Sequence, residues 1–139
     1  MSRVVSKTGA TGQDPEKVYT FLADLRHLDP LVPEETIENW QSCENQCHFQ
    51  LKGFGSLGME IVEKTPHKLV KLKNLQNPTL DFTLWIQIKQ VSPGDTRIRI
   101  TAEAGMNPAL ASMVTPYLQK GINAMVDKLT AYLDQQEGL

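Results

Sequence analysis

The sequence has no long hydrophobic run, no signal-like start and no excess of basic residues. Because no stretch of about 18 apolar residues occurs, we expect no integral membrane segment. The chain begins Met-Ser-Arg-Val-Val-Ser-Lys, without an apolar signal core, which favours a cytoplasmic location. Its formal net charge is −2. That balance predicts no nucleic-acid partner and no attraction to an anionic membrane.

Cysteine is also scarce, with two residues, Cys43 and Cys47, in the whole chain. They flank Glu44-Asn45-Gln46, which we expect to be a hairpin turn. We interpret them as reduced structural thiols, because the cytosol is reducing. A disulfide across the hairpin and a metal site are the alternatives. A metal would need two further ligands nearby, and only His48 is close, so we expect no metal and no cofactor.

What the sequence does contain is typical of one globular unit. Its 139 residues are 40% hydrophobic and 22% charged. A chain of this length buries roughly 68–70% of the surface that it exposes when unfolded, so a core can form without disulfides. No repeat, low-complexity segment or linker divides it. We therefore expect a single soluble domain over residues 1–139.

The first forty residues predict one strand and two short helices. Arg3 to Lys7 is typical of a strand, which Gly9 and Gly12 should end. Asp14 is a suitable N-cap because its carboxylate can accept backbone N–H groups, and Pro15 suits the first helical position. A second short helix over residues 26–29 should end at Pro30.

After residue 36 the hydrophobic period changes from 3.6 to 2, which predicts strands. The expected strands are Ile37–Ser42, Gln46–Leu51, Leu57–Glu63, Lys68–Leu75, Asp81–Val91 and Thr96–Ala104. The short turns between them indicate antiparallel hairpins. In the last two strands apolar residues alternate with polar ones, so one face of the sheet should be covered and the other wet. Trp85 is predicted on the wet face, where it shields neighbouring strands or marks a partner surface.

The cover is predicted to be a long C-terminal helix over about Asn107–Gln135. Its apolar stripe recurs every three or four residues. Pro116 should kink the helix or divide it after two turns, because proline loses one backbone hydrogen bond. A sheet with one apolar face beneath an amphipathic helix defines an α+β architecture.

Two segments give the chain a likeness to a known family. One is Asp14-Pro15-Glu16-Lys17-Val18-Tyr19-Thr20-Phe21-Leu22-Ala23-Asp24, ending at Pro33, and the other is Met106-Asn107-Pro108-Ala109-Leu110 before the terminal helix. From about Val4 to Leu133 the chain resembles the START-like, helix-grip superfamily, also called SRPBCC or polyketide cyclase/lipid transport proteins. The resemblance implies a curved seven-stranded antiparallel sheet around the C-terminal helix, two short helices after the first strand, and an apolar cavity. Members bind or transport lipids, sterols and aromatic molecules, some catalyse cyclisation, and others modulate chaperones.

No catalytic motif stands out, so catalytic residues remain unknown. Residues 53–58 match G-x-G-x-x-G, but an alternating strand pattern follows rather than the helix that a dinucleotide site needs. We interpret these glycines as serving a turn, bulge or sheet curvature. The three histidines are scattered, and no G-x-S-x-G elbow exists.

The inward-facing side chains predict a ligand-binding cavity between sheet and helix. Its expected lining is Phe49, Leu51, Met59, Ile61, Leu72, Asn74, Phe82, Leu84, Ile86, Ile100, Met113 and Tyr117. Solid packing of the same side chains is the alternative, since interiors are normally dense. The family resemblance and the glycines that curve the sheet favour the cavity.

Three polar side chains are candidates to orient one end of an apolar ligand: Glu38, Asn74 and Tyr117. The pattern leaves open whether Ile37 and Asn39 or Glu38 and Trp40 face inward. Satisfaction of these groups by nearby backbone is the alternative. The other strand charges should all point outward: Glu60, Lys71, Lys73, Asp81, Lys89, Arg97, Arg99 and Glu103.

The leading hypothesis is a monomeric or homodimeric protein that binds or transports a small hydrophobic, lipid-like or aromatic ligand. Pro116 and the segment 28–33 would border the entrance. One alternative is a cyclase or hydratase, which needs an inward acid or base such as Glu38 or His48. The other is a protein-interaction module of the chaperone-activator kind, with a solid core and an apolar patch around Trp85.

Overall fold

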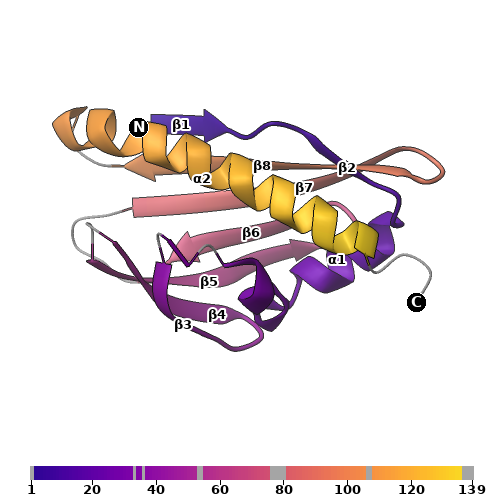
Figure 1. Ribbon diagram of the computed structural model, residues 1–139, viewed down its shortest axis with the longest axis horizontal. Coiled ribbons are helices and arrows are strands. Elements are labelled where there is room, and N and C mark those ends of the chain that lie inside the picture. Colours follow the sequence, from indigo (N-terminus) through magenta and orange to yellow (C-terminus); the bar gives the residue numbers. More distant parts are fainter. Residues whose placement is uncertain are drawn as a thin grey trace.

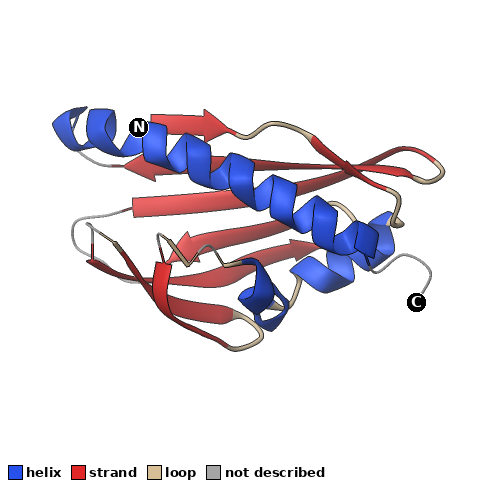
Figure 2. Ribbon diagram, in the orientation of Figure 1, coloured by secondary structure: helices blue, strands red, loops and turns tan. Residues whose placement is uncertain are grey.

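The computed structural model describes residues 2–32, 34–35, 37–52, 55–75, 81–105 and 108–135. A long helix crosses one face of a twisted sheet (Figure 1, Figure 2). The elements are β1 (Ser2–Val5), β2 (Gly9–Thr11), α1 (Pro15–Leu22), the 3-10 helix η1 (Leu25–Leu31), β3 (Ile37–Ser42), β4 (Gln46–Leu51), β5 (Gly55–Thr65), β6 (Leu69–Asn74), β7 (Asp81–Ser92), β8 (Asp95–Gly105) and α2 (Pro108–Gln135). Among the described residues, no helix is both long and apolar enough to cross a membrane.

The strands form one antiparallel sheet in the order β1-β8-β7-β6-β5-β4-β3. Successive strands from β3 to β8 pair with one another. β1 pairs with β8, the last strand, and forms the other edge of the sheet. The α+β helix-grip class predicted from the sequence is confirmed. The expected break at Gly9 is wrong, because Gly9–Thr11 forms β2 and pairs with β8 beyond the end of β1.

The second short helix is longer than predicted. η1 runs from Leu25 to Leu31 and includes Pro30, which was expected to end it. Asp24 caps its start by accepting a hydrogen bond from the backbone N–H of Arg26 at 3.0 Å. Leu25, Leu28 and Leu31 are all buried, because a helix with three residues per turn places every third side chain on one face.

The inner face of the sheet, the one that α2 covers, carries most of the core. Ile86 and Ile88 of β7 and Ile98 and Ile100 of β8 are buried there, as the alternation predicted. On the outer face, Thr101 is also buried, although alternation suggested a wet position. Its register neighbour is Trp85, which shields it.

Helix α2 is one continuous helix that contains Pro116, so the predicted division is wrong. Proline removes a single backbone hydrogen bond, and tertiary packing of the rest of the helix outweighs that loss. Its buried stripe comprises Ile122, Val126, Leu129 and Leu133. The predicted cap at Asn107 lies outside the described residues.

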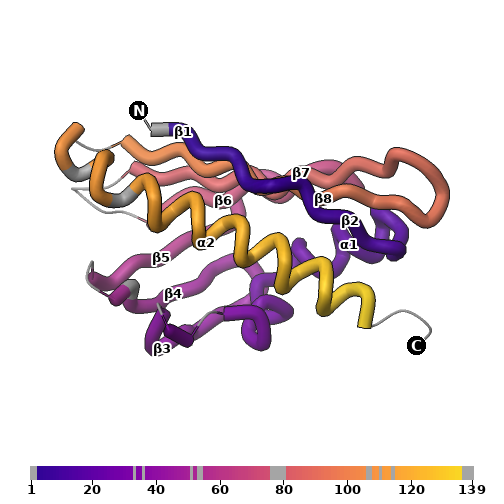
Figure 3. The backbone as a smooth tube through the Cα atoms, turned by 45° about the horizontal axis from the view of Figure 1, so that its top comes forward, coloured from indigo at the N-terminus to yellow at the C-terminus, as the bar shows by residue number. Residues whose placement is uncertain are grey.

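Polar contacts fasten one flank of α2 to β1, β2 and the segments that follow them. The Gln119 amide donates to the Val5 carbonyl at 2.9 Å, and Asn123 accepts from the backbone N–H of Lys7 at 2.8 Å. Nearer the C-terminus, buried Gln13 donates to the Leu133 carbonyl at 2.9 Å. The tube view shows this flank beside β1 and β2, with β3, β4 and β5 beyond the opposite flank (Figure 3). These contacts hold the helix from residue 119 onward.

Candidate functional site: the inner apolar surface

Side chains on the inner face of the sheet are not all equally buried. Val70 and Ile98 are inaccessible to solvent, whereas Phe82 and Leu84 of β7 are only half-buried. Phe82 pairs with Ala104 near the end of β8, at the end of the sheet where α2 begins (Figure 1). A side chain that lies on a covered face yet keeps accessible surface has space beside it for at least a water molecule.

Apolar side chains share this intermediate burial on β5, β7 and α2. We call them the inner apolar surface: Leu57, Met59, Ile61, Phe82, Leu84, Leu118 and Met125. All of them pack against the buried core. Because they come from the sheet and from the helix above it, they can contact opposite sides of one bound molecule.

Several of the predicted lining residues are instead part of the packed core. Four of them face inward as expected but are buried: Phe49, Leu72, Ile86 and Ile100. They belong to the core against which the inner apolar surface packs. The side chain of Leu51 lies outside what the structure describes. Met59, Ile61, Phe82 and Leu84 belong to the inner apolar surface itself.

The prediction that Met113 and Tyr117 face the interior is wrong. Their side chains are 70% and 79% exposed. At about 100° per residue they lie roughly 180° and 140° around α2 from buried Ile122. The sequence analysis placed them on a widened stripe, but the buried stripe of the helix does not include these two positions.

Two of the predicted polar anchors are also corrected. Glu38 is exposed and its carboxylate lies 3.6 Å from the ammonium of Lys52, on the outer face. Asn74 does face inward, but its amide is engaged with backbone. Its oxygen accepts from the N–H of Phe82 at 2.7 Å, and its nitrogen donates to the Leu75 carbonyl at 3.1 Å. Asn74 therefore holds together the ends of β6 and β7.

A β-bulge in β3 settles which residues of that strand face inward. The register with β4 shifts between Glu38 and Gln41, and Asn39 takes a left-handed φ of 55°. An extra residue in the strand reverses the alternation, so both Ile37 and Trp40 reach the inner side. The sequence carried no signal for this bulge.

Trp40 belongs to a cluster that sequence reasoning missed. Its ring stacks on Phe49 with centroids 5.7 Å apart. Its indole N–H donates to Asp29 of η1 at 2.5 Å, and the hydroxyl of Ser42 donates to the same carboxylate oxygen at 2.7 Å. Exposed Asp29 thus ties η1 to the edge strand and closes one side of the inner apolar surface.

The cysteines are free thiols, Cys43 exposed and Cys47 buried. Burial raises the pKa of the Cys47 thiol to about 11, because the thiolate would lose its hydration. Cys47 is therefore protonated at neutral pH. Within the described ranges, no three His, Cys, Asp or Glu side chains gather as a metal site would need.

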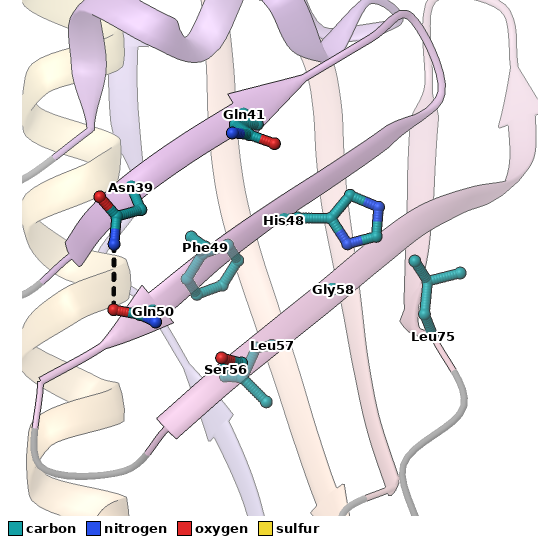
Figure 4. Close-up of a pocket in the computed structure, with 9 residues that line it drawn as sticks. All are labelled: Asn39, Gln41, His48, Phe49, Gln50, Ser56, Leu57, Gly58 and Leu75. Carbon is teal, nitrogen blue, oxygen red and sulfur yellow. Dashed lines mark hydrogen bonds between the residues drawn. The ribbon is translucent and has the colours of Figure 1, made fainter.

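The opposite face of the sheet carries a second feature, a shallow depression of about 440 Å³ (Figure 4). We call it the outer depression, and its lining is Asn39, Gln41, His48, Phe49, Gln50, Ser56, Leu57, Gly58 and Leu75. Phe49 and Leu57 border the inner side of the sheet as well. A Cβ atom at Gly58 would lie 2.9 Å from Cδ1 of Leu75 and 3.0 Å from Nδ1 of His48. Gly58 is followed by more strand, so in the described part of G-x-G-x-x-G it serves close packing, not a helix N-terminus.

The outer depression is polar and open. The Asn39 amide donates to Gln50 at 3.1 Å, and Asn39, Gln41, His48 and Gln50 are all exposed. The side chains of His48 and Gln50 alternate with those of Cys47 and Phe49 along β4, so they project away from the inner apolar surface. The predicted acid–base candidate His48 therefore lies on the wrong side of the sheet to reach a ligand there.

Comparison with solved structures identifies the fold. A START superfamily protein from Mycobacterium smegmatis is similar at a TM-score of 0.71 and 12% identity, with 96% of this chain and 98% of that chain covered. Truncated norcoclaurine synthase from Thalictrum flavum is similar at a TM-score of 0.76 and 13% identity, covering 95% and 92%. The same enzyme in complex with dopamine and hydroxybenzaldehyde gives a TM-score of 0.75 at 12% identity, covering 99% and 89%.

These likenesses show that the chain has the START-like helix-grip fold, as its sequence predicted. At such low identity they show the fold alone. A scan against models of known protein families finds no match, and a search of curated proteins finds none either.

Proposed function

We propose that the protein binds a small apolar ligand between the sheet and α2, on the inner apolar surface. The observation that supports this proposal is the half-burial of Phe82 and Leu84 on a face that a helix covers. Fully packed interiors leave large apolar side chains without accessible surface. A protein of the same fold has been solved with dopamine and hydroxybenzaldehyde, so the architecture is compatible with small-molecule binding.

The driving force would be removal of apolar surface from water. A ligand that buries about 200 Å² of apolar surface gains about 5 kcal/mol, before the costs of immobilisation are subtracted. Met59 and Met125 suit such a lining, because unbranched thioether side chains adapt to different ligand shapes. Carriage or sensing of a lipid-like or aromatic molecule are the roles that this chemistry supports.

Entry would involve the first turns of α2. The described contacts that fasten this helix to β1 and β2 begin at Gln119, and the described side chains of residues 108–118 are all half-buried or exposed. The predicted second border, residues 28–33, is less open, since Leu28 and Leu31 are buried. We therefore assign gating to the part of α2 around Pro116 rather than to η1.

The enzyme alternative needs an acid or base that points toward the ligand from the inner side. Glu38 and His48, the two groups that it required, project from the outer face. The interaction-module alternative relied on an apolar patch at Trp85, but that ring is half-buried with Lys71 and Arg3 beside it, at 5.6 and 5.9 Å from its centre. Ligand binding therefore remains the better-supported function.

The test is whether the protein carries or accepts a small molecule on the inner side. Denaturing extraction of freshly purified protein followed by mass spectrometry identifies any resident ligand. Titration with N-phenyl-1-naphthylamine, a neutral dye that fluoresces in apolar surroundings, measures access in delipidated protein. Saturable binding supports the proposal, and its absence together with an empty extract contradicts it.

Variants that fill the space on the inner side with a larger side chain test where the ligand binds. Leu84→Trp adds an indole from the sheet side, and Leu118→Trp adds one from the helix side, so each should weaken dye binding at least about tenfold by occupying the ligand's space. His48→Trp places the same side chain in the outer depression and is the matched control. A control variant that loses dye binding while the other two keep it would move the site to the outer face.

A further inference from the structure

Among the residues that the structure describes, no charged side chain belongs to the inner apolar surface, and the carboxylate of Asp29, which borders it, already accepts hydrogen bonds from Trp40 and Ser42. Every Asp, Glu, Lys and Arg that the structure describes is exposed, apart from five that are half-buried: Asp24, Glu60, Lys71, Asp95 and Glu103. Asp24 and Asp95 pair with Arg26 and Arg97 two residues along the chain.

The remaining three half-buried charges project from the outer face. Lys71 is the register neighbour of Trp85, and Glu103 is the neighbour of Arg3. Glu60 lies opposite Lys73 on β6. All three alternate with inward-facing residues of their strands, so the sheet separates them from the inner side.

By sequence, the positions outside the described ranges contain one ionisable side chain, that of Glu137. The stretch from Ala104 to Val126, which includes the first half of α2, contains Lys120 as its one charged residue. Lys120 is exposed.

Inward-facing polar groups beside the inner apolar surface already have partners or stay neutral, and the unpaired hydroxyl of Thr96 lies at the other end of β8. Ser42 donates to Asp29, and the Asn74 amide is bound to backbone on both sides. The Cys47 thiol keeps its proton at neutral pH, since burial raises its pKa to about 11. A ligand's own hydrogen-bonding groups would therefore lose water there without gaining a partner.

We infer that the inner apolar surface selects electrically neutral ligands whose buried part is hydrocarbon, with any polar group left at the entrance. This inference rests on the proposed function. An ion placed there loses its hydration and meets no opposite charge, which is the costly case for burial. The substrate class is thus neutral apolar molecules such as alcohols, esters or hydrocarbons, rather than fatty-acid anions or amines.

The test compares three ligands with one skeleton in competition with N-phenyl-1-naphthylamine at pH 7. They are 2-naphthylmethanol, 2-naphthoate and 2-naphthylmethylammonium, which are neutral, anionic and cationic. The alcohol should displace the dye, and each ion should bind about 100-fold more weakly. Either ion binding within about tenfold of the alcohol would overturn the charge selection.

Two variants at one position test whether the absence of an opposite charge causes the preference for neutral ligands. Met59→Lys places an ammonium at the inner apolar surface and should strengthen 2-naphthoate binding at least about tenfold relative to the alcohol. Met59→Gln, of similar length and uncharged, controls for the loss of the methionine: it should weaken binding but keep the alcohol ahead of both ions. If Met59→Lys does not fold, the ligand series on the wild-type protein still decides.

The two proposals fail in different ways. If neither the dye nor any naphthalene ligand binds, the proposed function is wrong and the inference falls with it. If all three ligands bind alike and Leu84→Trp blocks them, the site stands and only charge selection is wrong.

Discussion

Thr11 and Thr96 face each other across β2 and β8, yet only one of their buried hydroxyls has a hydrogen-bond partner among the residues that the structure describes. Thr11 Oγ1 donates to the Asp134 carboxylate at 2.7 Å. Thr96 Oγ1 is completely buried and finds no partner among the described residues. The register thus places a hydrogen-bonded and an unpaired hydroxyl side by side. Removing each in turn shows how much a paired and an unpaired buried hydroxyl contribute to stability.

Replacing Thr96 with Val should leave stability unchanged or raise it by about 1 kcal/mol, because the variant removes an unpaired buried hydroxyl and keeps the shape. Thr11→Val should lower it by about 1–3 kcal/mol, since the buried backbone N–H of Gln13 loses its acceptor and Asp134 loses one of its donors. Urea denaturation of both variants gives the free energies of unfolding. A Thr96→Val protein destabilised as much as Thr11→Val would show that Thr96 has a partner after all.

Gly9 should tolerate no larger residue, because β2 approaches α2 closely there. A Cβ atom at position 9 would lie 2.5 Å from Cγ1 of Val126 and 2.8 Å from Cγ2 of Thr130. We expect Gly9→Ala to cost about 1–3 kcal/mol by forcing the helix away. Thermal denaturation measures the change.

Gly121 provides the matched control for that substitution. It lies exposed in α2, and an added Cβ meets nothing within 4 Å. Gly121→Ala should therefore stabilise the protein by about 0.5–1 kcal/mol through helix propensity. Equal effects of the two substitutions would contradict the close contact at Gly9.

The two thiols should differ in reactivity. Cys43 is exposed, whereas burial both covers Cys47 and raises its pKa to about 11, and the thiolate is the reactive form. Ellman's reagent should titrate one thiol rapidly in the native protein and two after unfolding. Cys43→Ser should abolish the rapid phase, and a rapid phase that persists would mean that Cys47 is accessible.

Stability at acid pH should depend on the pair Asp24–Arg26. The guanidinium hydrogen-bonds the carboxylate at 2.6 Å and holds the pKa of Asp24 at about 2, against a usual 3.8. A folded pKa below the unfolded one stabilises the protein above pH 4, and this contribution is lost as the pH falls from about 4 to 2. Because Arg26 is exposed, solvent screens the pair and the effect on stability should be small.

Arg26→Gln should remove most of that pH dependence, because the cap hydrogen bond from the backbone N–H of residue 26 to Asp24 remains. The variant should be slightly less stable than the wild type at pH 7 and equally stable at pH 2, as measured by urea denaturation across the range. A difference that is the same at both pH values would point to packing by the arginine stem instead of the ion pair.

The architecture could be predicted because it depends on periodicity. Alternation in β7 and β8 and the apolar stripe of α2 each require a partner layer, and short turns leave antiparallel pairing as the simple connection. What could not be predicted depends on local backbone geometry. The bulge at Asn39, which brings Trp40 inward, leaves no pattern in the residue order. Pro30 normally ends a helix, so it hid the continuation of η1 to Leu31.

The site was predicted less well than the fold, for a related reason. Periodicity shows which face of β5 and β7 is apolar, and so it found Met59, Phe82 and Leu84. It does not show which positions around α2 are buried at each point along the helix, so Met113 and Tyr117 were misplaced. Nor does it show that a backbone N–H will occupy the amide of Asn74, which removes a predicted anchor.

The most direct measurement is a methyl NMR titration of the protein, labelled at its Met and Leu methyl groups, with 2-naphthylmethanol. Binding between sheet and helix should shift the methyl signals of Met59 and Leu84 in a saturable way and leave Leu75, in the outer depression, unchanged. Shifts centred on Leu75, or no shift at Met59 and Leu84, would contradict a ligand site on the inner face.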